Sequence, residues 1–288
     1  MNITERQQKI ISLLIEKEGL SSSAIRALLV EKGNNVSLVT VKRELSDLAR
    51  REILNTSGSG RSVIYTIGTV GRVFANIDAH AYCVREPDKR FGLRGYNFEL
   101  LNAFPDEIFS SEEKNIFNTA TAEYERRTTE IPPAIQKKEL ERLVIELSWK
   151  SSRIEGNTYT LLDTEKLILE NKEAPGHDRS EAQMILNHKD AFLFIREHTK
   201  EFQTLTPENS ERIHAILVKG LNVSVGLRGK PVGVLGSAYR PLDNAYQIRE
   251  AVDALTAAIA RMQTPYAKAM LAILGISYIQ PFEDGNKR

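Results

Sequence analysis

The sequence has almost no cysteine, no long apolar run and no excess of one charge. Cys83 is the single cysteine among 288 residues, so an intrachain disulfide framework is excluded and a reducing compartment is expected. No apolar run approaches the roughly 20 residues that a membrane-spanning helix needs. Residues 1–8 are polar and lack the apolar core of a signal peptide. We therefore expect a cytoplasmic protein without a membrane partner.

The charge balance limits the kinds of partner that composition can indicate. The formal net charge is +1 at pH 7, so no global basic field favours nucleic acid, and any such site must be local. Hydrophobic residues make up 41% and charged residues 27% of the chain, which is ordinary for a globular protein. The length permits two or three compact units with a sizeable core. Function must therefore be sought in local motifs.

The last ten residues, 279–288, carry the densest group of functional side chains. They have the order Ile-Gln-Pro-Phe-Glu-Asp-Gly-Asn-Lys-Arg and follow an apolar helical run. Asp284 offers a hard oxygen to Mg²⁺, which binds one or two carboxylates together with substrate phosphates. Four residues supply turned backbone N–H groups, an amide or positive charge to an anion: Gly285, Asn286, Lys287 and Arg288. The order favours a metal-bound polyphosphate site, although a surface turn has a similar composition.

This stretch resembles the signature of Fic-domain proteins, His-Pro-Phe-x-Asp/Glu-Gly-Asn-Gly/Lys-Arg, at eight of nine positions, from Pro281 to Arg288. At the ninth position Gln280 stands in place of the histidine. We call residues 280–288 the signature loop. The resemblance implies that the protein transfers AMP from ATP to a hydroxyl of a target protein, with Mg²⁺ at Asp284. It also implies that Gln280 occupies the catalytic position and that the last four residues of the loop bind the nucleotide.

Gln280 changes the expected chemistry. In the family the histidine accepts the proton of the attacking hydroxyl, and a glutamine amide cannot take a proton near neutral pH. General-base help is typically worth about 10²–10⁴ in rate, whereas electrostatic stabilisation and positioning can survive its loss. We therefore expect nucleotide binding with weak or absent AMP transfer.

Residues 151–157 have the order Ser-Ser-Arg-Ile-Glu-Gly-Asn and match the inhibitory motif Ser/Thr-x-x-x-Glu-Gly/Asn of many Fic proteins. From the residues alone, Ser151 and Glu155 lie one turn apart and Gly156 is a natural C-cap, which also fits an ordinary helix end. The resemblance implies that these three residues are autoinhibitory, the glutamate keeping the γ-phosphate from settling productively. Its usual partner is an arginine three residues after the signature arginine, and the sequence stops at Arg288, so the partner of Glu155 stays open.

Residues 1–68 are expected to form a winged helix-turn-helix. Apolar periodicity predicts helices over about residues 4–18, from the serine cluster 21–23 and from Ser37, followed by a β-hairpin within residues 53–67. The order resembles bacterial transcription regulators, whose third helix enters the major groove. The residues assigned to double-stranded DNA are Ser37, Thr40, Lys42, Arg43 and Arg61. Ten basic and seven acidic residues give residues 1–67 a charge of only +3, so a winged helix used for protein contact or dimerisation stays open.

Residues 69–175 are expected to be a mostly helical Fic N-terminal region with the inhibitory helix, and a short strand is predicted over residues 73–77. The inhibitory helix is predicted to run to about Ile154. Its predicted buried face consists of Leu140, Leu143, Val144 and Leu147. Residues 176–288 are expected to be the Fic core, with helices starting at Ser180, Thr206, Ala245 and Pro265. The last of these is predicted to bury Ala269, Ala272, Ile273 and Ile276.

The glycine-rich residues 226–241 predict a β-hairpin between two of these helices. Such an edge can hold an extended peptide by main-chain pairing, although a purely structural hairpin fits as well. The stretch resembles the Fic flap, and the resemblance assigns target docking to Val232, Gly233, Val234 and Gly236. The histidines at positions 188, 198 and 214 fall within the helices and receive no functional role.

The expected fold class is mainly α: an all-α Fic core with a β-hairpin flap, plus an N-terminal winged-helix domain. The leading function is a poorly active protein adenylyltransferase fused to a DNA-binding module, with ATP, Mg²⁺ and an unidentified target protein as partners. A nucleotide-sensing transcription regulator without transferase activity is the alternative. Removal of AMP from a protein, with Glu155 steering a water, is the third hypothesis, and homodimerisation stays open.

Overall fold

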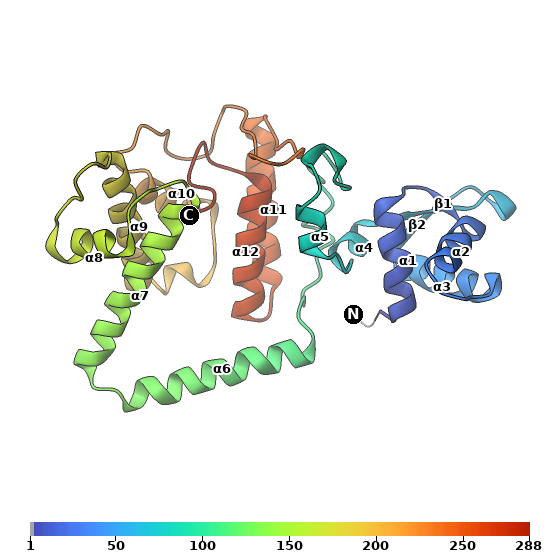
Figure 1. The fold of residues 1–288 in the computed structure, drawn as a ribbon, viewed down its shortest axis with the longest axis horizontal. Coiled ribbons are helices and arrows are strands. Elements are labelled where there is room, and N and C mark those ends of the chain that lie inside the picture. Colours follow the sequence, from blue (N-terminus) through green and yellow to red (C-terminus); the bar gives the residue numbers. More distant parts are fainter. Residues whose placement is uncertain (1–2) are drawn as a thin grey trace. The chain divides into compact units, whose positions relative to one another are not determined.

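The computed structural model describes residues 3–288, and its fold is mainly helical, with 59% helix and 3% strand (Figure 1). The chain divides into two compact units. The first comprises Met1–Pro105 together with Gly233–Arg240, and the second comprises Asp106–Val232 together with Pro241–Arg288. Within residues 3–288, no helix combines the length and the apolar character needed to cross a membrane.

The first unit begins with helices α1 (Glu5–Glu16), α2 (Ser22–Glu31) and α3 (Leu38–Arg50). Each helix starts where a hydroxyl side chain accepts a backbone N–H of the first turn. These N-caps are Thr4, Ser21 and Ser37. Hydroxyl N-caps satisfy donors that a helix start leaves unpaired, which is why the predicted starts are confirmed.

A small antiparallel sheet follows these helices in the order β1-β3-β2. Its strands are β1 (Leu20–Ser21), β2 (Leu54–Ser57) and β3 (Ile64–Ile67). The short helical turn η1 (Gly60–Ser62) lies in the connection between β2 and β3. One buried cluster joins the helices to the sheet and includes Ile10, Ile25, Leu45, Leu48 and Ile67. The predicted hairpin of residues 53–67 is therefore present.

The predicted strand over residues 73–77 is wrong. Helix α4 (Thr69–Val73) ends at the first of these residues, residues 74–78 are irregular, and α5 (Ala79–Cys83) and η2 (Pro87–Lys89) follow. Two backbone groups of the irregular stretch bond to one side chain of α1: the Gln8 amide donates to Phe74 O (3.1 Å) and accepts from Asn76 N (3.2 Å). Because Gln8 satisfies these two groups, they need no strand partner.

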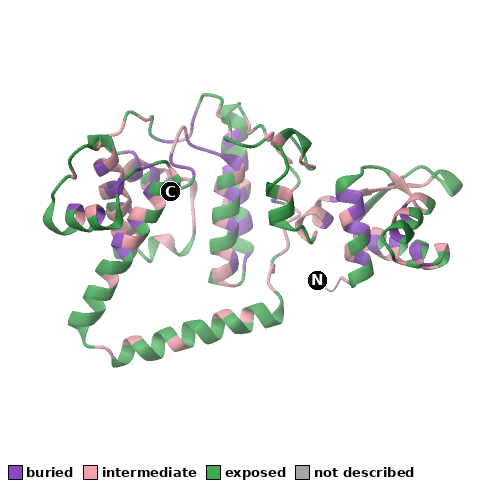
Figure 2. Ribbon diagram, viewed as in Figure 1, coloured by how far each residue is buried: buried purple, intermediate pink, exposed green. Residues whose placement is uncertain are grey.

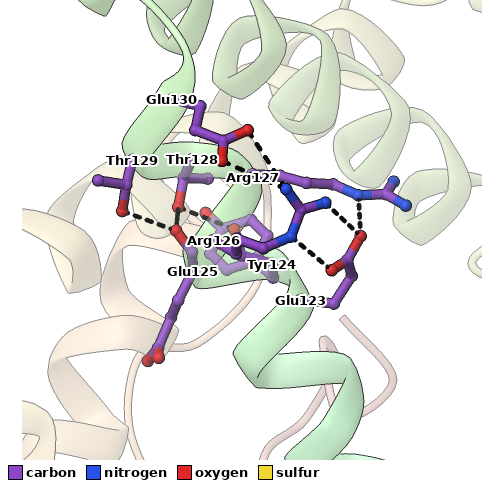
Figure 3. Close-up of polar contacts among 8 residues, drawn as sticks. All are labelled: Glu123, Tyr124, Glu125, Arg126, Arg127, Thr128, Thr129 and Glu130. Atoms are coloured by element: carbon purple, nitrogen blue, oxygen red, sulfur yellow. Dashed lines mark hydrogen bonds and ion pairs between the residues drawn. The ribbon is translucent and has the colours of Figure 1, made fainter.

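The second unit opens with α6 (Ser111–Glu130), which the structure leaves without buried residues (Figure 2). Its last turns are stabilised by charges on the helix surface. Arg126 donates to Glu123 and Glu130, and Arg127 donates to Glu123 at 2.6 Å (Figure 3). The hydrogen bonds from Arg126 and Arg127 lower the pKa of Glu123 to about 2. Such i,i+3 and i,i+4 pairs support a helix in which no residue is fully buried.

The remaining helices of this unit are α7 (Pro133–Ile154), α8 (Leu161–Glu170), α9 (Arg179–Glu197), η3 (Glu201–Gln203), α10 (Pro207–Leu217), α11 (Ala245–Arg261) and α12 (Pro265–Ile279). Helix α9 packs against both α7 and α10, and α11 runs beside α12 (Figure 1). The predicted start of α10 at Thr206 is confirmed by its side-chain cap. Helix α9 starts after Asp178 and not at Ser180, two residues earlier than predicted.

The predicted buried face of α7 is wrong in part. Val144 is buried, but Leu143 and Leu147 are exposed. The face toward α9 instead carries the small side chains Ser148 and Ser152, together with Ile145. Small side chains let α7 and α9 approach each other closely. The side of α7 that packs on α9 is therefore determined by side-chain size and not by hydrophobicity.

The predicted face of α12 is also wrong, because Ala269 is exposed and Ile273 is 66% exposed. The buried residues are Ala267, Leu271, Gly275 and Ile279. A Cβ at Gly275 would lie 2.2 Å from Leu255 Cδ1 of α11. Helix α11 can approach α12 this closely only on the side of Gly275. This contact fixes the rotation of α12 about its axis, and therefore the direction in which the signature loop leaves the helix.

The predicted β-hairpin over residues 226–241 is wrong, because this segment contains no strand. Its backbone groups bond to partners outside any hairpin ladder. Arg228 N donates to Pro281 O (3.0 Å), and Arg240 N donates to Arg94 O (2.8 Å). A local turn joins Ser237 N to Val234 O (3.1 Å). The segment is therefore an irregular loop whose ends are held by distant carbonyl groups.

Candidate functional site

The signature loop begins where α12 ends at Gln280. The residue adopts a left-handed conformation with φ of +52°, and its backbone N donates to Ile276 O (2.9 Å). A left-handed residue at the helix end reverses the chain direction. The loop therefore leaves α12 in a turn at Gln280, the residue that stands at the predicted catalytic position.

The side chain of Gln280 is folded back onto its own helix. Its Nε2 donates to Ser277 O at 2.7 Å, and the residue is buried. The predicted catalytic position is thus filled by a neutral amide whose nitrogen already donates to Ser277 O. The amide oxygen is the only side-chain group there that could accept a hydrogen bond from an attacking hydroxyl.

Arg228 holds the start of the loop from the neighbouring segment. Its Nε donates to Gln280 O (2.7 Å), Nη1 to Lys230 O (2.8 Å) and Nη2 to Leu242 O (2.5 Å). The side chain is buried, so these carbonyl groups compensate much of its lost hydration. Together with the backbone bond to Pro281 O, Arg228 fixes two consecutive loop carbonyls.

His214 of α10 holds the middle of the loop. Its ring stacks on Phe282 at 4.0 Å and 6°, and Nε2 lies 3.1 Å from Asp284 O. Gly226 N donates to Nδ1 at 3.2 Å, so Nδ1 is an acceptor and the proton is assigned to Nε2. Burial lowers the pKa of His214, and the charge of Arg288 acts in the same direction. The ring is therefore neutral and links three segments.

Sequence reasoning missed this role of His214. The only sequence signal is its spacing, since Ser210 and Leu217 lie four residues before it and three after it on the buried side of α10. A single histidine on such a side is usually a packing residue. Its partners on the signature loop become visible only in the fold.

The interior of the loop is closed by Asn286. Its Oδ1 accepts from Phe282 N (3.0 Å) and its Nδ2 donates to Phe282 O (2.8 Å). Gly285 has φ of +85°, and a Cβ there would lie 3.3 Å from Arg288 Nη2. Asn286 thus shapes the loop with both ends of its amide, and Gly285 provides the left-handed turn between the acid and the bases.

Asp284 and Arg288 form the charged centre of the loop. Asp284 Oδ2 lies 3.3 Å from Arg288 Nη2, and Oδ1 accepts from Gly285 N at 2.7 Å. The Asp284 side chain is 44% exposed, whereas that of Arg288 is fully buried. Arg288 Nη1 donates to Leu217 O (3.2 Å), and its Nε is buried without a partner within residues 3–288. The pair offers an accessible acidic oxygen beside a fixed guanidinium.

The donor set fits Mg²⁺ only together with phosphate oxygens. Residues 3–288 contain no group of three or more His, Cys, Asp or Glu side chains that could hold a metal alone. Glu283, beside Asp284, pairs with Lys230 Nζ at 3.3 Å. Hydrogen bonds from Ser224 and then Lys230 lower the pKa of Glu283. Asp284 is therefore the carboxylate left for a cation, which suits a metal that takes one carboxylate and several phosphate or water oxygens.

The segment predicted to be inhibitory, residues 151–157, contacts the signature loop through Glu155. Lys287 Nζ is 3.7 Å from Glu155 Oε2, and the Glu155 side chain is only 12% exposed. Gly156 has φ of +89° and ends α7 at Glu155. Ser151, one turn earlier, is half-buried. The structure thus gives Glu155 a basic partner that the sequence did not identify.

His188 of α9 lies beneath this contact. Its Nδ1 is 3.3 Å from Ser148 Oγ of α7. Burial lowers its pKa to about 4, and the nearby charge of Arg288 contributes. The ring is therefore neutral at pH 7 and adds no positive charge near Arg288.

A cavity of about 270 Å³ lies between α10, α12 and the loop. One part of its wall is apolar and includes Leu205, Ile213, Ala272, Ile273, Ile276 and Phe282. The other part consists of loop residues, among them Gly285, Asn286, Lys287 and Arg288. The cavity therefore joins an apolar wall to the polar and basic residues of the signature loop.

The residues assigned to the flap are divided between the two units. Val232 belongs to the second unit, and Gly233, Val234 and Gly236 belong to the first. Within the first unit Gly236 O accepts from Arg90 Nη1 at 2.8 Å. The structure therefore places this segment in an irregular loop and provides no strand edge for a peptide.

The residues assigned to DNA lie on α3 and η1 of the first unit. Lys42, Arg43 and Arg61 are exposed, whereas the Ser37 and Thr40 hydroxyls contact each other at 2.9 Å. The hydroxyls thus cap α3, and the three basic side chains remain at the surface.

The acidic residues of α3 are occupied within the unit. Gln7 Nε2 donates to Glu44 (3.0 Å) and Asp47 (3.1 Å). Asp47 also pairs with Arg50 and Arg51, and the hydrogen bond from Arg50 is the largest cause that lowers its pKa. The acidic side chains of α3 are thus paired within the unit, in part with Arg43 and Arg50 of the same helix, while Lys42 stays exposed.

Residues 204–288 match the family model described as the Fic/DOC family. These residues form a Fic/DOC domain. The domain contains His214, Arg228 and the whole signature loop, whereas α7 with Glu155 precedes it. The geometric partners of the loop therefore come both from within the Fic/DOC domain and from the helix before it.

Two solved structures of Fic proteins are similar to this chain in fold, and a third matches it with a lower TM-score. A Fic family protein from Desulfovibrio desulfuricans is 19% identical, with a TM-score of 0.52, over 64% of this chain and 56% of that one. Fic-1 from C. elegans is 14% identical, with a TM-score of 0.52, over 100% of this chain and 81% of that one. A Fic-domain signalling protein from Bacteroides thetaiotaomicron is 20% identical, with a TM-score of 0.47, over 57% and 65%. The chain thus spans less than two thirds of the two bacterial structures, and no curated protein matches it as a relative.

Proposed function

We propose that the Fic/DOC domain binds ATP with Mg²⁺ at the signature loop and is a protein adenylyltransferase scaffold with weak AMP transfer. The observation that carries this proposal is the pairing of Asp284 with Arg288 in a loop held by His214, Arg228 and Asn286. A rigid loop that presents one accessible carboxylate and fixed positive charge suits a magnesium-bound phosphate chain. Members of the Fic family commonly transfer AMP.

The roles of the loop residues follow from their contacts. Asp284 would hold Mg²⁺, which supplies neutralisation of phosphate charge when bound. Arg288 is fully buried and fixed by Leu217 O and Asp284, so it contributes positive charge beside Asp284 without further loss of side-chain freedom. Lys287 adds a half-exposed charge that is paired with Glu155. These groups bind and orient the nucleotide and require no proton transfer.

The transfer itself needs a proton acceptor that Gln280 does not provide. In AMP transfer the hydroxyl oxygen of the target bonds to the α-phosphorus, and the bond to the bridging oxygen of pyrophosphate breaks. Pyrophosphate leaves with the bonding electron pair, and the hydroxyl proton passes to water. Without an imidazole at position 280, we expect the rate to be lower by about 10²–10⁴.

Glu155 and the segment 232–236 complete the proposal. The ion pair of Glu155 with Lys287 holds that lysine away from an incoming phosphate, and the carboxylate repels the anion. Val232, Gly233, Val234 and Gly236 are proposed to dock the target segment, which would have to order this irregular loop on binding. Ordering of this kind lowers affinity and makes target recognition weak in isolation.

The test is ATP binding by calorimetry with and without Mg²⁺, using the full chain and Asp284→Asn. We expect magnesium-dependent binding that the variant loses and that the control Asp253→Asn, on the exposed face of α11, retains. Absence of ATP binding by the full chain would reject the nucleotide site. Binding that is equal for all three proteins would reject the role of Asp284.

For the first unit we propose binding of double-stranded DNA, because a specific observation favours it. The exposed side of α3 carries Lys42 and Arg43, while Glu44 and Asp47 are bonded to Gln7. The test is fluorescence anisotropy of a labelled duplex pool at increasing salt. Affinity that falls steeply with salt supports the proposal, and absence of binding at low salt rejects it. A further outcome would favour the alternative function: ATP changes the affinity for DNA, and neither the original chain nor Gln280→His transfers AMP. The protein would then be a nucleotide-sensing transcription regulator and not a transferase.

A further inference from the structure

The outward side of α3 has an apolar side chain among its basic ones. Val41, Leu45 and Leu48 are buried on the inner side of the helix. At 3.6 residues per turn, the opposite side carries Val39, Arg43, Ser46 and Arg50, and all four are exposed. The first-turn position on this side is thus a valine, flanked by Lys42 and Arg43.

Val39 is 78% exposed, and the described residues of the unit give its two methyl groups little contact. The side chain is β-branched, so its χ1 rotamer is already restricted within a helix. A contact with a partner would therefore bury apolar surface with a small loss of side-chain entropy. Val39 is suited to recognise one compact apolar group.

The neighbouring groups limit what α3 can recognise beside Val39. The Ser37 and Thr40 hydroxyls are used in the cap of the helix. The acids Glu44 and Asp47 are paired with Gln7 and with arginines of the same unit, among them Arg43 and Arg50 of α3. Lys42 and Arg43 can reach phosphates or guanine acceptors. Val39 is the exposed first-turn side chain that could read an apolar feature.

The major groove of DNA presents one apolar group in its code, the C5 methyl of thymine. We propose that Val39 contacts a thymine C5 methyl, so that the DNA site of this protein contains a thymine facing the first turn of α3. The inference rests on the proposed DNA binding of α3 and specifies its sequence preference. Residues near the N-terminus of a helix in the major groove are the ones that reach base edges.

The test compares thymine with deoxyuridine, which pairs with adenine but lacks the methyl group. Duplexes retained by the full chain are selected from a random-sequence pool, and each thymine of the selected duplex is then replaced in turn. We expect one position at which deoxyuridine lowers affinity about fourfold, the effect of losing one buried methyl group. Val39→Ala should bind the thymine and deoxyuridine duplexes with the same affinity.

Val30→Ala is the matched control, because Val30 is an exposed valine on α2. It should retain the full preference for thymine. The inference is overturned if deoxyuridine has no effect at any position, or if Val39→Ala keeps the preference, while the duplexes are still bound. Failure of the full chain to bind any duplex rejects the DNA-binding proposal itself, and the two failures are therefore distinguishable.

Discussion

Lys287 Nζ lies 3.7 Å from Glu155 Oε2, so the end of α7 and the signature loop are joined by an ion pair. The glutamate is largely buried and the lysine is half-exposed. This arrangement gives the carboxylate a basic partner within the loop. The same lysine is one of the groups proposed to attract phosphate, so under that proposal Glu155 and a phosphate compete for it.

Replacing Glu155 by glutamine should therefore strengthen ATP binding. The variant removes both the ion pair and the repulsion between its carboxylate and the phosphates. Ion pairs with one exposed partner are worth little, so we expect an increase in ATP affinity of about fivefold at low salt and less at high salt. Calorimetry at two salt concentrations measures this change. Glu141→Gln, on an exposed part of α7, should leave the affinity unchanged, and an equal effect in both variants would contradict the role of Glu155.

Replacing Gln280 by histidine should raise AMP transfer. Histidine tolerates the left-handed backbone that this position requires, and it supplies the missing proton acceptor. We expect an increase of about 10² or more in the rate of label transfer from ATP labelled on the α-phosphate. Gln280→Asn is the control, because asparagine also tolerates this backbone but cannot accept the proton. The prediction fails if both variants transfer label at the rate of the original chain although they bind ATP.

The parts of the fold that sequence could predict are those decided by local chemistry. Thr4, Ser21, Ser37 and Thr206 mark helix starts because a hydroxyl before an apolar run satisfies free backbone donors. Gly156 marks the end of α7 for a similar local reason. These signals depend on residues within one turn, so they are present in the sequence itself.

The features that sequence could not predict depend on distant partners. Helix α12 is apolar on all sides, so its buried face was chosen by the fit of Gly275 against Leu255. The segment 226–241 has a hairpin composition, but Arg228 bonds to Pro281 and Gln280 more than fifty residues away. The role of His214 in the candidate site has the same origin. Packing between elements, and not local propensity, decided these positions.

His214 should be necessary for the geometry of the loop. His214→Phe preserves an aromatic ring against Phe282 but leaves Gly226 N and Asp284 O without their partner. Unsatisfied buried groups cost about 1–3 kcal/mol each, so we expect the free energy of unfolding to fall by about 2–4 kcal/mol and ATP affinity to fall with it. Urea denaturation and calorimetry measure the two effects. His198→Phe, at the C-cap of α9 and outside the loop, should leave ATP affinity unchanged.

His188 should make the second unit sensitive to acid. Burial lowers the pKa of its ring from about 6.5 to about 4, so the folded state favours the neutral form. The contribution of His188 to the free energy of unfolding is fully present above pH 6.5. It is lost as the pH falls from 6.5 to 4, because the unfolded chain binds the proton first. We expect the free energy of unfolding to fall by about 3 kcal/mol over this interval. Unfolding at pH 7, 5.5 and 4 should show a shallower pH dependence for His188→Gln than for the control His80→Gln, and equal slopes would refute the assignment.

Arg61 should contribute to DNA affinity without contributing to sequence preference. It lies in η1, between β2 and β3, and is exposed, so it can contact a phosphate but has no fixed direction toward a base. Each phosphate contact changes the slope of log K against log salt by about 0.9, and Arg61→Ala should therefore lower that slope by about one unit for every duplex tested. Arg142→Ala, an exposed arginine on α7 of the second unit, should preserve the slope. A loss of affinity for one duplex only would instead assign Arg61 to base recognition, because phosphate contacts carry no sequence information.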